Sequence, residues 1–219
     1  MIVRRKGVPM KRRTFLLKLY QDRKDETLAA LEALGPEIRE TASRLGVGNF
    51  SIWTVENLLC GYGEYDSDVD LDAAPVLRAK LEPVMDGSAE VICPTGSMRL
   101  MYHDIGVVRQ DKSLIRHRVF VTKLKPGCTE EYKRRHDALI EARGDAISDG
   151  PDSNFTIWYG GGYIFGYCEK VKAFDREMTE DERRDTITWE KKQLEIMDWL
   201  TDDVDWITGE KHEAIRRIV

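Results

Sequence analysis

The sequence predicts an α+β fold made of two tandem copies of one βαββαβ unit. A five-residue pattern at residues 49–53 (Asn-Phe-Ser-Ile-Trp) returns 105 residues later at residues 154–158 (Asn-Phe-Thr-Ile-Trp). The strands and helices expected around this pattern follow the same order in both places. The length of 219 residues also suits two units of about 100 residues each.

The likeness between the two halves extends well beyond this pattern. At a fixed offset of 105, fourteen of fifty-one residue pairs over residues 15–65 are identical, where chance would give about three. The identical pairs include an aromatic residue, a glycine and an acidic residue: Phe15/Phe120, Gly61/Gly166 and Glu64/Glu169. We therefore predict a tandem duplication, with a first, degenerate repeat at 13–104 and a second repeat at 116–219.

Each repeat is expected to begin with a strand, a helix and a strand pair. Short apolar runs rich in β-branched and aromatic residues predict the strands, which are 14–20, 49–54 and 57–65 in the first repeat and 117–124, 154–159 and 163–170 in the second. Apolar residues at helical spacing predict helices at 24–45 and 129–147, with Thr129 as the N-cap of the latter. Three glycines at 160–162 predict a tight hairpin.

The remainder of each repeat is expected to form a second helix and a closing strand. In the second repeat this helix starts at a capping box, residues 179–182 (Thr-Glu-Asp-Glu). Its apolar face is expected to hold four residues: Ile187, Leu194, Met197 and Leu200. The closing strands are expected at 98–102 and 212–218.

The βαββαβ order is the ferredoxin-like pattern, in which helices cover one face of a four-stranded antiparallel sheet. The other face must be buried or used for binding. Two copies in one chain meet this need by packing face to face as a pseudo-dimeric α+β barrel, with a cavity between the sheets. Residues 105–115 would connect the copies.

Composition disfavours several classes of protein. The net charge of −5 and the pI of about 5.5 argue against a nucleic-acid binder. No run approaches the roughly 18 apolar residues of a membrane span, and the basic start lacks the apolar segment of a secretory signal. The dispersed cysteines are expected to be reduced thiols: Cys60, Cys93, Cys128 and Cys168. We expect a cytoplasmic protein that binds neither nucleic acid nor membrane and is a monomer or associates further.

One pair of side chains has the chemistry of a proton-transfer site. Tyr132 and His136 stand four residues apart in an expected helix and therefore share one face of it. Histidine titrates near neutrality and phenol can donate or relay a proton. At the offset of 105, the first repeat has Thr27 and Leu31 in their place, so we expect a single site, in the second repeat.

Residues 124–136 (Leu-Lys-Pro-Gly-Cys-Thr-Glu-Glu-Tyr-Lys-Arg-Arg-His) resemble the helix-start motif of the L-rhamnose mutarotase family. In the first repeat, residues 35–37 (Gly-Pro-Glu) resemble that family's Trp-Pro-Glu, and residues 49–53 resemble its Asn-Tyr-x-Ile-Tyr strand. The likeness covers residues 13–66 and 117–170. Members of the family are single βαββαβ units that form dimeric α+β barrels.

The resemblance implies an enzyme that interconverts the α and β anomers of a 6-deoxy aldose such as L-rhamnose, without metal or organic cofactor. His136 and Tyr132 would be its catalytic pair, because they match the family's histidine and tyrosine. Aromatic rings that suit the apolar face of such a sugar are candidates for substrate binding: Trp158, Tyr159, Tyr163, Tyr167 and Trp189. The first repeat could contribute through Trp53, Tyr62 or Tyr102.

Two departures from the family concern the substrate. The family has an adjacent Trp-Trp pair in its second helix, where this chain has Gln193 and Leu194, and the hairpin at 160–162 is shorter. Two alternatives therefore stay open. One is another enzyme on the same barrel, such as a cofactor-free monooxygenase, a lactone isomerase or a haem enzyme. The other is a sugar-binding protein without catalytic activity.

Overall fold

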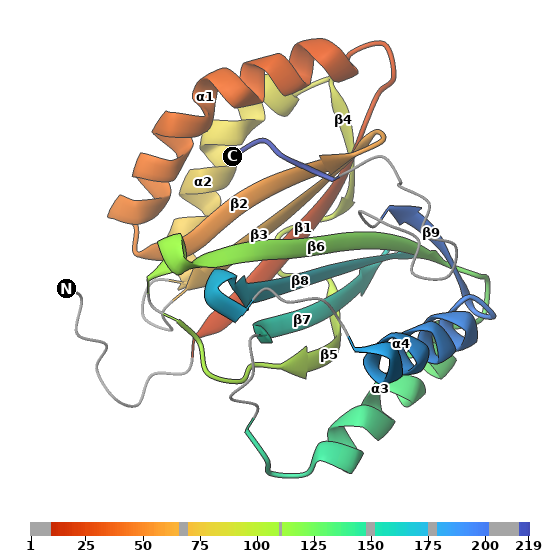
Figure 1. The fold of residues 1–219 in the computed structure, drawn as a ribbon. Helices are drawn as coiled ribbons and strands as arrows, with labels where there is room; N and C mark the ends of the chain where they lie inside the picture. The colour runs from red at the N-terminus through yellow and green to blue at the C-terminus, as the bar shows by residue number, and fades with distance from the viewer. Residues whose placement is uncertain (1–9, 66–69, 110, 148–151, 175–178, 202–214) are drawn as a thin grey trace. The chain divides into compact units, whose positions relative to one another are not determined.

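The computed structural model describes residues 10–65, 70–109, 111–147, 152–174, 179–201 and 215–219. The chain divides into two compact units, one built from Met1–Met98 with Arg216–Val219 and the other from Arg99–Ile215. Within the described residues, each unit has a five-stranded antiparallel sheet and two α-helices (Figure 1). The predicted α+β class with two antiparallel sheets is thus confirmed.

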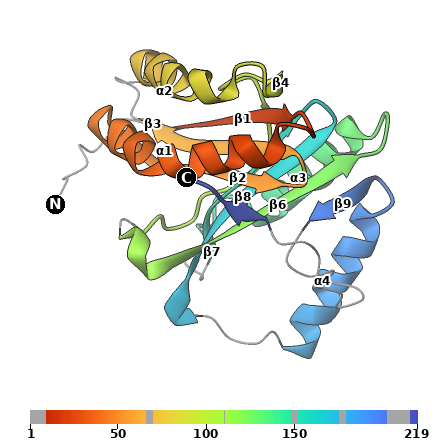
Figure 2. The ribbon, with the colours of Figure 1, turned by 90° about the horizontal axis from the view of Figure 1, so that it is seen from above.

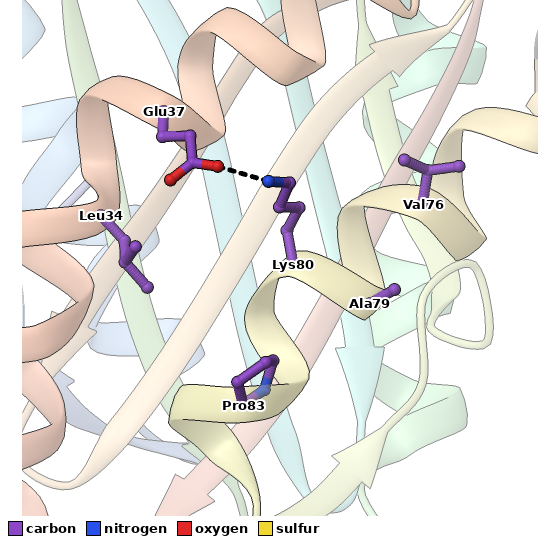
Figure 3. Close-up of a pocket in the computed structure, with 6 residues that line it drawn as sticks. All are labelled: Leu34, Glu37, Val76, Ala79, Lys80 and Pro83. Carbon is purple, nitrogen blue, oxygen red and sulfur yellow. Dashed lines mark hydrogen bonds and ion pairs between the residues drawn. The ribbon is translucent and has the colours of Figure 1, made fainter.

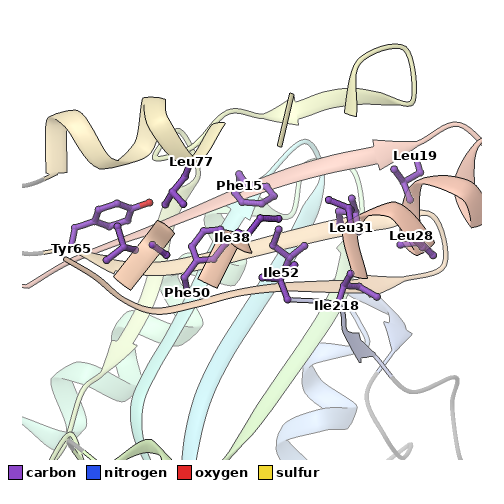
Figure 4. Close-up of a cluster of buried hydrophobic side chains, with 14 residues drawn as sticks. Phe15, Leu19, Leu28, Leu31, Ile38, Phe50, Ile52, Tyr65, Leu77 and Ile218 are labelled. Carbon is purple, nitrogen blue, oxygen red and sulfur yellow. The ribbon is translucent and has the colours of Figure 1, made fainter. Parts of the chain in front are cut away.

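The first unit has the strand order β10-β2-β3-β1-β4. Its strands are β1 (Lys11–Leu19), β2 (Val47–Val55), β3 (Leu58–Tyr65), β4 (Ala89–Cys93) and β10 (Arg216–Arg217). Its helices α1 (Lys24–Arg44) and α2 (Asp70–Met85) lie together on one face of this sheet (Figure 2). The core between helices and sheet contains Leu31 and Ile38 of α1 packed with Ile52 of β2 and Ile218 (Figure 4), as the helical spacing of the apolar residues predicts.

The second unit has the strand order β5-β7-β8-β6-β9. Its strands are β5 (Arg99–Asp104), β6 (Ile115–Leu124), β7 (Asp152–Gly160), β8 (Tyr163–Val171) and β9 (Met197–Thr201), and its helices are α3 (Thr129–Arg143) and α4 (Glu180–Gln193). The predicted hairpin joins β7 to β8, with Gly161 and Gly162 both at positive φ. Two successive positive φ values favour glycine in such a turn.

Equivalent residues of the two units occupy equivalent positions in their sheets. Phe15 pairs with Gly61 across β1 and β3, and Phe120 pairs with Gly166 across β6 and β8. The phenylalanine ring covers the glycine in both pairs, since a Cβ at Gly61 would lie 1.9 Å from Phe15 and a Cβ at Gly166 would lie 2.1 Å from Phe120. Only glycine leaves room for the ring, which explains why both residues recur.

A buried carboxylate also occupies the same place in each unit. Glu64 accepts hydrogen bonds from Asn49 and Tyr62, both at 3.2 Å. These three residues have counterparts 105 positions later: Asn154 at 3.0 Å and Tyr167 at 3.1 Å donate to Glu169. Asn49 and Asn154 also have left-handed backbones, with φ of 52° and 54°, a conformation that asparagine tolerates better than most residues. The hydrogen bond to the carboxylate and the left-handed backbone together explain why both copies of the repeated pattern begin with asparagine.

The closing strands of the two units differ from those predicted. β4 pairs with β1 and β9 pairs with β6, so these two strands complete the βαββαβ order. The expected strand at 98–102 is β5, which pairs instead with β7 of the second unit. Of the expected strand at 212–218, residues 212–214 lie outside the described part, and β10 pairs with β2 of the first unit. Each sheet therefore gains its fifth strand from the other half of the sequence.

Two further details of the second unit correct the sequence interpretation. The capping box at Thr179 and Glu182 is present, but α4 ends at Gln193, and Met197 and Leu200 belong to β9 rather than to the helix. A short apolar run can form either a strand or a helix, and here residues 197–201 pair with the edge of β6. The N-cap of α3 is Cys128 instead of Thr129.

The face-to-face packing of the two sheets stays a prediction, as do the tandem duplication and the repeat boundaries 13–104 and 116–219. Among the described helices, none is both long and apolar enough to cross a membrane.

Candidate active site

Tyr132 and His136 lie one turn apart on α3, as predicted, and their rings stack. The ring centroids are 4.2 Å apart with an interplanar angle of 27°. The two side chains are only 2% and 4% exposed. Tyr132 packs with Phe120 of β6 and Ile157 of β7, so the pair lies in the layer between the second sheet and its helices.

A hydrogen bond fixes the orientation of the imidazole. The Nδ1 atom of His136 lies 2.9 Å from the backbone carbonyl oxygen of Tyr132. Because a carbonyl oxygen can only accept, Nδ1 must donate, and the neutral ring then has its lone pair on Nε2. The geometry therefore presents Nε2 as a proton acceptor.

Burial shifts the pKa values of both groups. It lowers the pKa of His136 from 6.5 to about 4, against a smaller opposing effect of the hydrogen bond to Tyr132. It also raises the pKa of Tyr132 well above its usual value, and the charge of Glu190 adds to this shift. At neutral pH the site thus holds a neutral imidazole beside a protonated phenol, which together can accept one proton and donate another.

Aromatic rings surround the pair. His136 makes edge-on contacts with Trp189 of α4, at a centroid distance of 5.4 Å, and with Tyr102 of β5, at 5.5 Å. Tyr102 in turn contacts Phe155 of β7 at 5.3 Å, and Tyr159 packs against the same cluster. These four rings are half-buried, whereas His136 and Tyr132 themselves are buried.

Charged residues of the motif hold α3 in place. The buried guanidinium of Arg135 donates to Glu131 on its own helix, to Glu195 at 2.9 Å and to the backbone carbonyl of Lys192 at the end of α4. These bonds tie α3 to α4, which lie beside each other (Figure 1). Ion pairs at both ends of α3 connect it to β5: Glu130 with Arg99, and Arg143 with Asp104.

The structure brings together some of the predicted substrate-binding residues and separates others. Tyr159 and Trp189 lie in the same layer as His136. Trp158, Tyr163 and Tyr167 project from the opposite face of the sheet, because neighbouring residues of a strand alternate between faces. Tyr167 there donates its hydroxyl to Glu169. These three residues are therefore not part of the site around His136.

One further residue of the site was anticipated from the sequence, and others were not. Tyr102 is one of the three residues through which the first repeat was expected to contribute, and β5 places it against His136. The other two, Trp53 and Tyr62, bond instead within the first unit, to Ser51 and Glu64. Glu190 and Phe155 were not predicted as site residues, because their proximity to the pair depends on how α4 and β7 pack.

A groove of about 480 Å³ lies in the first unit, between α1 and α2 (Figure 3). Leu34 and Val76 contribute apolar surface to it, and Glu37 and Lys80 form an ion pair across it. Among the residues that the structure describes, no cluster of histidine, cysteine and acidic side chains could hold a metal ion.

The low pKa of His136 predicts a pH-dependent stability. The unfolded chain protonates this imidazole below about pH 6.5, whereas the folded chain does so only near pH 4. The contribution of the neutral imidazole to the free energy of unfolding is therefore fully present above pH 6.5 and is lost as the pH falls toward 4. At 1.36 kcal/mol per pKa unit, the loss amounts to about 3 kcal/mol. Denaturant unfolding at several pH values should show this loss in the parent and not in His136→Gln. Equal pH dependence of the two proteins would contradict the assignment.

Comparison with known proteins shows that the second half of the chain is similar to a family. A family model described as L-rhamnose mutarotase matches residues 117–217, which confirms the resemblance in the second half of the chain, whereas the resemblance of residues 13–66 stays a prediction. Comparison with curated proteins gives no match. Among solved structures, a candidate monooxygenase from Fusobacterium nucleatum is similar at 13% identity and a TM-score of 0.43, covering 90% of this chain and 94% of that one. A candidate chlorite dismutase is similar at 12% identity and a TM-score of 0.41, covering 90% and 96%.

Proposed function

We propose that this protein interconverts the α and β anomers of an aldose, with His136 and Tyr132 as its catalytic pair; the match of residues 117–217 to the L-rhamnose mutarotase model supports this proposal. The observation that supports this proposal most directly is the stacked pair itself. A neutral imidazole with a free Nε2 lone pair lies against a protonated phenol, and both are sheltered from water.

Mutarotation needs two coordinated proton transfers at one carbon. Ring opening removes the proton of the anomeric hydroxyl, breaks the bond between the anomeric carbon and the ring oxygen, and adds a proton to that oxygen. Both oxygens are bonded to the same carbon, so the base and the acid must lie side by side. The centroid distance of 4.2 Å between the rings of His136 and Tyr132 meets this need.

The roles follow from the protonation states. His136 Nε2 accepts the proton of the anomeric hydroxyl, and the Tyr132 hydroxyl donates its proton to the ring oxygen. The imidazolium and phenolate formed are opposite charges in direct contact, which offsets part of the cost of creating them in a buried layer. After the open chain rotates, both transfers reverse on the other face of the carbonyl. No proton is gained or lost overall.

The surroundings of the pair favour a 6-deoxy sugar such as L-rhamnose. Such a sugar has a methyl group and C–H bonds that can pack against aromatic rings. The half-buried rings of Tyr102, Tyr159 and Trp189 offer that surface next to His136. The hydroxyl groups of the sugar need polar partners elsewhere in the site.

Exchange NMR on equilibrated sugars tests the proposal. Saturation transfer between the two anomeric protons should show faster exchange with the protein than in buffer, for L-rhamnose and then for L-fucose and other aldoses. A variant of the exposed His103 in β5, His103→Ala, should retain the parent rate. Folded protein that accelerates no aldose would refute the mutarotase activity, and substrate oxidation by oxygen would then support the monooxygenase alternative.

A further inference from the structure

We propose that Gln193 is the residue that positions the sugar, by hydrogen bonding to two of its adjacent hydroxyl groups; this inference rests on the proposed function and extends it. Gln193 is the last residue of α4 and only 2% exposed. Neither its Oε1 nor its Nε2 has a hydrogen-bond partner among the described residues. Buried carboxamides normally have such partners, because leaving them unpaired is costly.

The position of Gln193 on α4 places it near the catalytic pair. Trp189 stands one turn earlier on the same helix and contacts the ring of His136. Glu190, between them, is close enough to Tyr132 for its charge to act on the phenol. Next to Gln193, the carbonyl of Lys192 accepts a hydrogen bond from Arg135, the neighbour of His136. This face of α4 is therefore packed against the part of α3 that holds the pair.

A second unpaired polar group lies in the same layer. The hydroxyl of Thr122 on β6 is fully buried and also lacks a hydrogen-bond partner. Thr122 lies between Phe120 and Leu124 on the strand, and both of these pack in the cluster that contains Tyr132. Its side chain therefore projects from the helix-covered face of the sheet. Two unpaired polar side chains in one buried layer point to a polar ligand there.

The chemistry of these groups defines the ligand class. A carboxamide has one accepting oxygen and one donating nitrogen, and a hydroxyl can donate and accept. Two neighbouring hydroxyl groups on a sugar ring match a carboxamide in both respects. A ligand without hydrogen-bonding groups would leave Gln193 unpaired. The site therefore favours a pyranose with free adjacent hydroxyls, whose apolar face packs on Trp189.

The test replaces the carboxamide by an apolar side chain of similar size, in Gln193→Leu. We expect KM for L-rhamnose to rise about tenfold or more while kcat stays within about threefold, since the lost contacts bind substrate and do not transfer protons. The melting temperature should stay equal or rise, because an unpaired buried amide is removed. Thr188→Val, on the exposed side of α4, is the matched control and should leave both constants unchanged.

The outcomes separate a binding role from a structural one. An unchanged KM would overturn the inference, whatever the melting temperature. If the parent protein accelerates exchange of no aldose, calorimetric binding of L-rhamnose to parent and variant takes the place of KM. A dissociation constant about tenfold higher for Gln193→Leu would then support the inference without the mutarotase activity. Equal constants, or no binding by the parent, would overturn it.

Discussion

The variant His136→Ala is expected to lose about 10²–10⁴-fold in kcat for anomer exchange, the usual contribution of a positioned acid–base group. In the parent, burial keeps the imidazole neutral, and the bond from Nδ1 to the carbonyl of Tyr132 leaves Nε2 free to accept a proton. Alanine removes this acceptor and leaves Tyr132 without a partner in the transfer. Exchange NMR at saturating sugar, corrected for the buffer rate, measures the effect.

The pH dependence of the parent gives an independent check. With the pKa of His136 near 4, kcat/KM should stay constant from about pH 8 to 5 and fall by half near pH 4. An ordinary histidine would cause that fall near pH 6.5. A decrease already at pH 6.5 would show that His136 is not the buried base. If a folded His136→Ala protein keeps the full rate, His136 has no role in catalysis.

Removal of the buried carboxylate of Glu169 is expected to destabilise the chain by about 3–5 kcal/mol, the usual effect of breaking a buried ion pair. Glu169 is 0% exposed, and both of its oxygens lie 2.7 Å from Lys112 Nζ. It also accepts hydrogen bonds from Asn154 and Tyr167. Glu169→Ala therefore leaves two buried donors, Asn154 and Tyr167, without this acceptor. Urea unfolding followed by tryptophan fluorescence measures the loss.

A matched variant separates burial from charge in this test. Glu141→Ala removes a carboxylate from an exposed position of α3, and such changes usually stay within about 0.5 kcal/mol of the parent. Lys112→Met should also destabilise the chain, because it leaves the carboxylate of Glu169 buried without this cation. If Glu169→Ala unfolds at the same urea concentration as Glu141→Ala, the cluster does not stabilise the second unit.

The site could be predicted only in part from the sequence. Tyr132 and His136 were found because i and i+4 residues of a helix share a face, a rule that needs no tertiary contact. The prediction of aromatic substrate-binding residues was less accurate. Strand alternation puts Trp158 and Tyr159 on opposite faces of the sheet, and the packing of the helices decides which face holds the pair. The proximity of Glu190 and Gln193 to the pair depends on how α4 packs on α3, which residue spacing alone does not define.

The sequence by itself determined the local structure of this protein: the helix that carries Tyr132 and His136, the capping box at Thr179, and the glycine hairpin. These features depend on backbone preferences and side-chain spacing within a few residues. Only the tertiary structure decided that β5 and β10 complete the sheets of the other half, and which residues surround His136. Edge strands pair with whatever free edge the fold presents to them, and a buried layer forms where distant elements meet; neither is written in a short stretch of sequence.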